Sequence, residues 1–296
     1  MQGSSSSSAD NSATIAGVGA IGLWGLLALL TALTGTVPAL QLSAFTFGSG
    51  AILMTAIAAF RGRLHALRPT PASLALGLYG IFGDTLLYFF ALKFAPPAEA
   101  NLIHYLWPLL IVLFAAFLPG GRLRFVHVAG AMLGLAALIA LIGGRGGVAL
   151  SANALIGYVC AALGALVWST YSVLSRRVAA VPSESVAITC ACAAVLSFGL
   201  HLAFETTAWP RGVEWIGMIG LGLGPMGAAF LLWDIGMKRG NVPLLGVLSY
   251  SAPVISTITL VLAGYAETGW ALGAVVLLIV AGASIASRPE RSAQQD

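Results

Sequence analysis

The sequence is short of charge. Only 8% of its 296 residues are Asp, Glu, Lys or Arg, whereas 59% are hydrophobic and the mean hydropathy is +0.95. A soluble domain carries roughly 25% charged residues, so this composition excludes an ordinary soluble protein. A helix that crosses a bilayer needs about 20 apolar residues. Ten stretches meet this need, namely 14–34, 40–60, 72–93, 98–118, 125–144, 153–175, 184–204, 213–237, 242–263 and 269–287. The sequence therefore predicts an all-α membrane protein with ten transmembrane helices.

Cysteine and histidine are also scarce. Cys160, Cys190 and Cys192 fall inside predicted helices without a C-x-x-C pair, which indicates neither a disulfide framework nor a zinc site. The four histidines are scattered, and no Ser-His-Asp or paired-carboxylate spacing is visible. We therefore expect a protein that is not an enzyme, with no catalytic residues, no metal and no cofactor.

The few basic residues are distributed unevenly. Of 14 Lys and Arg residues, only Lys93, Arg145 and Arg211 fall in one set of alternating loops. Cytoplasmic loops retain Lys and Arg, so both termini are predicted to face the cytoplasm. The net charge of +4 reflects this bias, and we expect no nucleic-acid partner. Residues 1–13 contain a Ser run without Lys or Arg, which predicts a disordered cytoplasmic tail.

Two stretches of the sequence share a pattern of residues. Lys93–Pro108 reads KFAPPAEANLIHYLWP, and Lys238–Pro253, 145 residues later, reads KRGNVPLLGVLSYSAP. Each combines a Lys, a turn rich in Gly or Pro, an apolar helix start and Tyr-x-x-Pro, which indicates a duplication. Each copy holds five segments, an odd number, so the copies have opposite orientations, as in secondary transporters. We predict a first five-helix repeat at 14–147, a second, inverted repeat at 148–287 and a cytoplasmic tail at 288–296.

Ten segments, a five-plus-five repeat and Tyr-x-x-Pro in segments four and nine resemble the drug/metabolite transporter superfamily, specifically its EamA-type branch. Within it, Asn101-Leu-Ile-His-Tyr-Leu-Trp-Pro108 is similar to the corresponding helix of aromatic amino-acid exporters of the YddG type in the bacterial inner membrane. This resemblance implies a central cavity lined mainly by segments 1, 3, 4, 6, 8 and 9, and alternating access. Ala252 and Gly246 stand where the first copy has Trp107 and Asn101, so the cavity should be asymmetric.

Segment four carries the richest polar and aromatic cluster. Helical spacing places Asn101, Tyr105 and Pro108 near one face, with His104 and Trp107 adjoining. These side chains fall near the middle of the span, where a phenol or an indole N–H finds water only in a cavity. The alternative is that Tyr105 and Trp107 serve packing or an interfacial belt. For His104 a hydrogen bond between helices and a place in the cavity remain open.

Four other residues complete the predicted substrate site: Tyr79, Tyr88, Trp168 and Tyr250. Trp168 lies 144 residues after Trp24, so the two repeats match these rings, and two rings flanking one cavity would suit a flat aromatic ligand. The alternative for Trp24 is packing against lipid.

Pro108 and Pro253 are predicted hinges, because each removes a backbone donor at a matched position in a helix. The turns Pro96-Pro97 and Gly240–Pro243 are included with them. The alternative is that these prolines set static kinks.

Asp84 is the acid deepest in the predicted membrane. A carboxylate near the bilayer centre costs at least about 2.5–3.5 kcal/mol on insertion scales, so it usually has a function. Asp84 could bind a substrate ammonium or carry a coupling proton, and the alternative is a structural, hydrogen-bonded Asp. Asp234 lies one turn before Lys238, a spacing that predicts an ion pair near the membrane surface.

We therefore predict a monomer or weak homodimer in the bacterial inner membrane that exports aromatic or other hydrophobic amino acids. Cationic or lipophilic drugs are the rival substrates, because an acid and aromatic rings also hold a quaternary ammonium. A phosphorylated metabolite is less suitable, since every Lys and Arg lies at or beyond a helix end. A channel is the alternative of another class.

Overall fold

The computed structural model describes residues 3–118, 125–142 and 152–264, together with residues 277, 278, 281 and 285. Throughout these residues the ordered elements are helices, and no strand occurs among them. Seven described stretches are long and apolar enough to cross a membrane: Asn11–Ala32, Ala39–Phe60, Pro71–Phe94, Ala154–Val178, Ser183–Phe204, Val213–Arg239 and Val242–Leu262. The predicted all-α, multi-pass class is confirmed. The predicted tenth segment and the tail 288–296 lie almost entirely outside the described residues.

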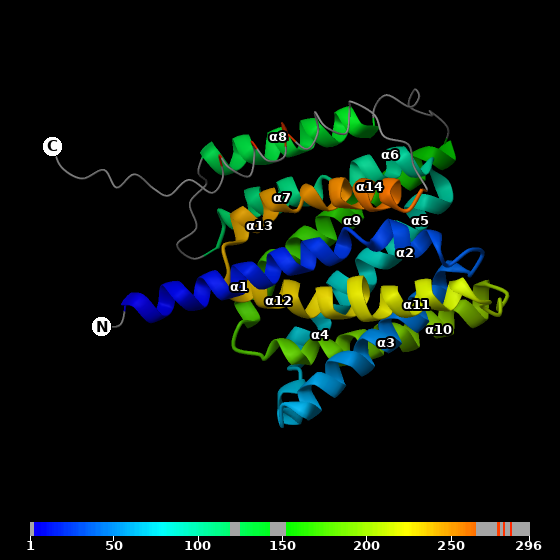
Figure 1. Ribbon diagram of the computed structural model, residues 1–296, viewed down its shortest axis with the longest axis horizontal. Coiled ribbons are helices and arrows are strands. Elements are labelled where there is room, and N and C mark those ends of the chain that lie inside the picture. Colours follow the sequence, from blue (N-terminus) through cyan, green and yellow to red (C-terminus); the bar gives the residue numbers. More distant parts are fainter. Residues whose placement is uncertain are drawn as a thin grey trace.

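The helices run side by side through the molecule (Figure 1). In the first half they are α1 (Gly3–Trp24), α2 (Leu27–Ala32), α3 (Ala39–Phe60), α4 (Pro71–Gly77), α5 (Gly83–Phe94), α6 (Pro97–His104), α7 (Trp107–Ala115) and α8 (Phe125–Ile142). In the second half they are α9 (Ala152–Leu174), α10 (Val186–Phe204), α11 (Val213–Leu223), α12 (Ala229–Arg239), α13 (Val242–Leu248) and α14 (Ser251–Leu262). The sequence predicts disorder as far as residue 13, whereas α1 begins at Gly3.

The helix of each Tyr-x-x-Pro segment is broken near its middle. The first break separates α6 from α7 at Tyr105 and Leu106, and the second separates α13 from α14 at Ser249 and Tyr250. The 145-residue shift relates the two breaks to within one residue. In each case the proline falls in the first turn of the following helix, where a missing N–H costs nothing because first-turn donors have no partner within the helix.

A second pair of irregular turns is also matched. Leu78–Phe82 between α4 and α5, and Gly224–Ala228 between α11 and α12, are both π-helical. The same shift relates them, again to within one residue. Wide turns of this kind interrupt the hydrogen-bond ladder and occur often at functional sites. Two independent irregularities thus recur at the sequence period of the duplication.

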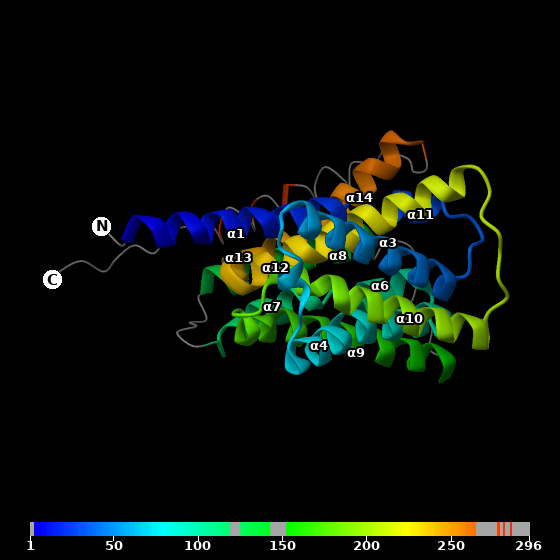
Figure 2. The same cartoon turned by 90° about the horizontal axis from the view of Figure 1, so that it is seen from below.

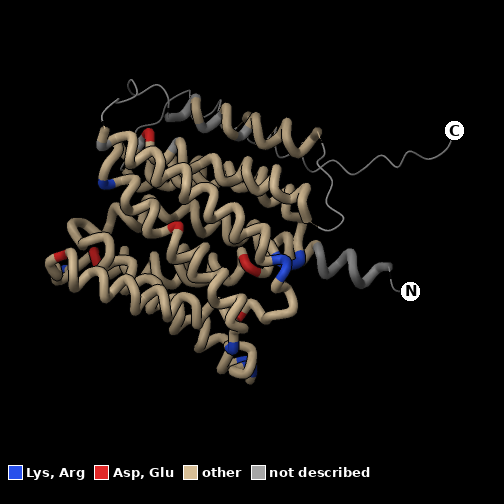
Figure 3. The backbone as a smooth tube through the Cα atoms, turned by 180° about the vertical axis from the view of Figure 1, so that it is seen from behind, with Lys and Arg blue, Asp and Glu red and all other residues tan. Residues whose placement is uncertain are grey.

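Close packing joins helices that are distant in the chain. Helices α3 and α10 lie side by side, as do α1 and α12, and α5 lies against α9. Seen from below, α11 and α14 lie on one side of the molecule, and α9 and α10 on the other (Figure 2). Among the described residues, most Lys and Arg gather at the end where α1 begins and at the turn after α3 (Figure 3). The core between these layers contains the aromatic and polar residues that make up the candidate site.

Candidate functional site: a polar cluster beside an aromatic cluster

Two helices bring a polar cluster together inside the first half. Asp84 of α5 pairs with His104 of α6, and 2.8 Å separates Asp84 Oδ1 from His104 Nε2. One turn further along α5, the Tyr88 hydroxyl donates to Asn101 Oδ1, and the Tyr88 ring lies 4.7 Å from the His104 ring, centroid to centroid. The side chains of Asp84 and His104 are 17% and 13% exposed, so the pair is largely but not fully removed from solvent. We call these four residues the polar cluster.

Helix α9 closes one side of the polar cluster with a glycine. A Cβ on Gly164 would lie 3.1 Å from Asp84 Oδ1 and 3.1 Å from His104 Cδ2. Such contacts are tighter than packed side chains normally make, so any residue larger than glycine would press against Asp84 and His104. Gly164 therefore lets α9 approach both members of the pair at once.

An aromatic cluster lies next to the polar one. Its members come from α1, α7, α9 and α12: Trp24, Trp107, Trp168, Phe230 and Trp233. Trp24 is at its centre, with its ring centroid 5.1 Å from that of Trp233 and 5.6 Å from that of Trp168. Trp107 and Trp168 meet edge to face at 6.3 Å, a favourable arrangement for aromatic rings. The rings are in contact with one another in this state.

The polar atoms of the aromatic cluster have partners. Trp24 Nε1 donates to the carbonyl of Pro225 at 3.0 Å, inside the π-helical turn between α11 and α12. Trp233 Nε1 donates to Ser172 Oγ at 3.0 Å. Buried N–H groups left without acceptors would cost roughly 1–3 kcal/mol each, so these bonds hold the indoles in defined orientations. The π-helical turn supplies an acceptor that a regular helix would have used internally.

The two clusters are adjacent along two different helices. On α9, Gly164 precedes Trp168 by one turn, and across the α6–α7 break His104 precedes Trp107 by three residues. A carboxylate, an imidazole and a carboxamide are therefore held next to a surface of indole rings. This arrangement can bind a small molecule that carries both a charged amine and a flat apolar group.

The structure brings together most of the sequence-predicted residues but not all of them. Tyr88, Asn101, His104 and Asp84 form the polar cluster, and Trp107 and Trp168 belong to the aromatic one. Tyr105, at the break, packs against the aromatic cluster.

Two predicted residues lie elsewhere. Tyr79 is 44% exposed and its hydroxyl is 2.9 Å from Thr170 Oγ1, on the side of α9 that also exposes Leu163 and Leu166. Tyr250 is fully buried in a separate cluster with Val112 and Ala131 of α7 and α8, together with Val247 and Val254. Their hydroxyls do not lie in the polar cluster.

Two residues of the candidate site, Gly164 and Phe230, were not predicted from the sequence. Phe230 contacts Trp24 and Trp168 with ring centroids 6.3 and 5.9 Å apart, and no spacing singled it out among 13 phenylalanines. Gly164 is one of 36 glycines, so nothing in the sequence could have distinguished it.

The predicted ion pair between Asp234 and Lys238 is confirmed at 2.7 Å, but it is buried, with side chains 4% and 3% exposed. Lys238 Nζ also donates to the carbonyl of Val181 at 2.9 Å, and Arg176 donates to the carbonyl of Gly240 at 2.9 Å. These hydrogen bonds join the end of α12 to the segment that connects α9 and α10. They serve packing at that end rather than the candidate site.

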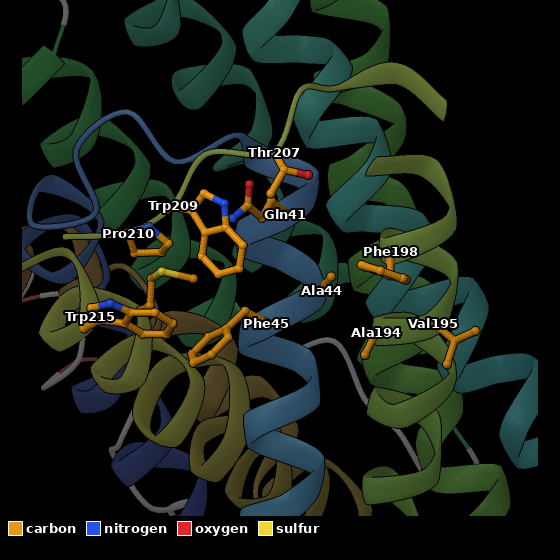
Figure 4. Close-up of a pocket in the computed structure, with 11 residues that line it drawn as sticks. Gln41, Ala44, Phe45, Ala194, Val195, Phe198, Thr207, Trp209, Pro210 and Trp215 are labelled. Carbon is orange, nitrogen blue, oxygen red and sulfur yellow. The ribbon is translucent and has the colours of Figure 1, made fainter. Parts of the chain in front are cut away.

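A recess of about 440 Å³ lies away from both clusters, between α3, α10 and α11. Phe45, Trp209, Pro210 and Trp215 gather at one end of it, and Phe198 lies on the α10 side (Figure 4). None of the predicted site residues lines this recess. It opens on the outside of the helix bundle, so it is not the predicted central cavity.

Comparison with known proteins gives a consistent result. The EamA-like transporter family matches the chain twice, over residues 11–143 and 155–288. An aromatic amino acid exporter YddG from Ancylobacter novellus is 52% identical over 256 residues, which cover 86% of this chain and 89% of that relative. The YddG proteins of Salmonella typhimurium and Escherichia coli are each 26% identical over 165 residues, covering 54% of this chain and 56% of each relative.

A solved crystal structure has the same fold, with a TM-score of 0.90 and 52% sequence identity over 94% of this chain and 96% of that chain. The family matches cover most of the sequence and both halves of it. The chain, a multi-pass membrane protein, belongs to the EamA-like transporter family.

Proposed function

We propose that this protein exports aromatic amino acids across the bacterial inner membrane by alternating access. It works as a monomer or weak homodimer in the bilayer, with ten helices arranged as two inverted five-helix repeats. The two family matches, and the helix breaks and π-helical turns that recur 145 residues apart, support the repeats. The relatives named as aromatic amino acid exporters support the substrate class.

The observation that carries the proposal is the adjacency of the polar and aromatic clusters. An aromatic amino acid has an ammonium, a carboxylate and a flat ring within a few bonds of one another. Asp84 is the anion available to the ammonium, and the indoles of Trp107 and Trp168 provide a surface for the ring. Burying about 200 Å² of an aromatic side chain at about 25 cal/mol per Å² contributes roughly 5 kcal/mol.

Asn101 is the proposed donor to the substrate carboxylate. Because its Oδ1 accepts the Tyr88 hydroxyl, the orientation of the amide is fixed and its Nδ2 group points elsewhere as a donor. Tyr88 thus acts indirectly, by orienting Asn101. Tyr79 and Tyr250 are not in the proposed site, since they lie outside the polar cluster.

We further propose that the described state is closed toward the cytoplasm. Near the end where α1 begins, α7 packs closely against α13, and a Cβ on Gly246 would lie 2.9 Å from Val112 and 3.1 Å from the Pro108 carbonyl. At the other end, the described parts of α5, α6 and α9 make no extensive contact with α2, α11 and α14. The aromatic cluster joins these two groups of helices and forms the barrier between the polar cluster and the cytoplasm.

The proposed orientation, with both termini in the cytoplasm, rests on the gathering of basic residues at one end (Figure 3). Single cysteines at Thr36 and Arg63, in a background without the native cysteines, test it. Thr36→Cys should react with a membrane-impermeant maleimide in intact spheroplasts and Arg63→Cys only after lysis. The reverse pattern would invert the topology.

Transport is tested by uptake of radiolabelled Phe, Trp, Ala and methyl viologen into proteoliposomes, with Trp107→Ala as the variant. Trp209→Ala is the matched control, because Trp209 is 82% exposed and lies in the outer recess. We expect saturable Phe and Trp flux that Trp107→Ala removes and Trp209→Ala retains. Flux of methyl viologen alone would indicate a drug exporter, and flux that does not saturate would indicate a channel.

A further inference from the structure

We propose that His104 carries the coupling proton of this transporter, and that His104 and the substrate ammonium take turns at Asp84. One proton then enters the cell for each amino acid that leaves. This inference rests on the proposed function and adds to it the source of energy for export.

The geometry of the pair carries the inference. Only 2.8 Å separates His104 Nε2 from Asp84 Oδ1, so in this state the imidazole occupies the one carboxylate that the polar cluster contains. A substrate ammonium that binds Asp84 must displace the imidazole. Both side chains retain some exposed surface, 13% for His104 and 17% for Asp84.

The surroundings leave the cluster with a single anion. From α5 the titratable neighbour is Tyr88, and from the α6–α7 break it is Tyr105. Helix α9 contributes Gly164 at this level, and no Lys or Arg of the described chain makes an ion pair there. Two cations held by one carboxylate in a partly dry site repel each other, so an arriving ammonium favours the neutral form of His104.

The resulting cycle conserves charge and protons. With the site open to the cytoplasm, the substrate ammonium binds Asp84, and His104 releases its proton to cytoplasmic water. The loaded protein turns outward and the amino acid leaves. His104 then takes a proton from the outside and pairs with Asp84 again. The empty protein returns with that proton, so each cycle moves one amino acid out and one positive charge in.

The test measures protons per amino acid. Proteoliposomes that contain Phe and the pH dye pyranine are diluted into Phe-free buffer of equal pH, with potassium and valinomycin to clamp the potential. The wild type should take up close to one proton per Phe released. Equivalently, a difference of one pH unit should sustain a Phe gradient of about tenfold.

His104→Gln removes the proton site and keeps a polar side chain of similar length. We expect this variant to lose proton uptake and to keep Phe–Phe exchange at a reduced rate, because Asp84, Asn101 and the indoles that hold the substrate are all still present. Three results would overturn the proposal: a wild type that releases Phe without taking up protons, a His104→Gln variant with the wild-type ratio, or a variant without exchange. The last result would make His104 necessary for binding rather than for coupling.

Gly164→Ala tests the same pair while keeping both titratable groups. The added methyl would lie 3.1 Å from Asp84 Oδ1, so it should weaken the pair and lower the proton-to-Phe ratio roughly twofold or more. Gly83→Ala is the matched control, since its methyl would meet nothing closer than 3.8 Å. Equal ratios in the two variants would count against a role for the pair.

Phe release and Phe–Phe exchange together separate a protein that does not transport aromatic amino acids from one that transports them without His104 as the proton carrier. If the protein does not transport aromatic amino acids, the wild type shows neither Phe release nor Phe–Phe exchange. If it transports them without His104 as the proton carrier, exchange is normal and only the proton ratios disagree.

Discussion

Replacing Lys238 by Met should lower the stability of the protein more than the loss of most surface charges would. Its ammonium is 2.7 Å from Asp234, and both side chains are nearly inaccessible to solvent. At an effective dielectric constant of about 20, the Coulomb attraction across that distance is about 6 kcal/mol before desolvation is subtracted. Without Lys238, the Asp234 carboxylate stays buried without a counter-charge and the Val181 carbonyl loses its donor.

Breaking one partner of a buried pair costs about 3–5 kcal/mol, whereas replacing both by neutral groups of similar shape is close to neutral. For a protein of this size we expect the apparent melting temperature of Lys238→Met to fall by on the order of 5–10 °C. The double variant with Asp234→Asn should recover most of that loss.

The assay is thermal unfolding of purified protein in detergent, followed by tryptophan fluorescence. Lys93→Met is the matched control, because Lys93 is exposed and its Nζ lies 5.9 Å from the centroid of the Phe94 ring, a contact worth about 0.5–1 kcal/mol at most. The reasoning is refuted if Lys238→Met is as stable as the wild type, or if the double variant is no more stable than the single one.

Three further predictions concern other parts of the molecule. Gly80→Ala should destabilise by at least about 1–3 kcal/mol, since its methyl would overlap the Tyr171 ring, and a melting scan would detect this loss. Glu205→Gln should cost about 1–2 kcal/mol in the same scan, because its carboxylate accepts backbone N–H groups at the start of α3. Replacing Pro108 and Pro253 together by Ala should slow Phe flux in proteoliposomes without lowering apparent affinity. If the rates are unchanged, both prolines only set static kinks.

The sequence predicts the helix interruptions well because they depend on local chemistry. A proline within an apolar run must either start a helix or break one, so Pro108 and Pro253 locate both breaks to within a few residues. The first π-helical turn could not be predicted in this way. Leu78–Phe82 contains no proline, and its geometry depends on the packing of Gly80 against Tyr171.

The polar cluster was predicted as a set of residues but not as a set of contacts. Asp84 and His104 lie 20 residues apart on separate helices, and only the antiparallel packing of those helices determines that they pair. Tyr79, by contrast, was predicted in the site but lies outside it. Its helix carries it to an exposed side of α9, and neither periodicity nor composition distinguishes that side from the interior.

The aromatic cluster shows why one sequence can predict a site that a single state does not display. Trp24 and Trp168, matched between the repeats, are expected to flank a cavity, yet their rings are in contact at 5.6 Å. A transporter that alternates between two openings must close each one in turn, and the same residues then serve as cavity wall in one state and as barrier in the other. Each ring contact of this kind is worth only about 0.5–1.5 kcal/mol, so separating one pair costs less than the roughly 5 kcal/mol that burial of an aromatic substrate ring contributes. The indoles can therefore form both the barrier in the described state and the ligand surface in the state that binds substrate.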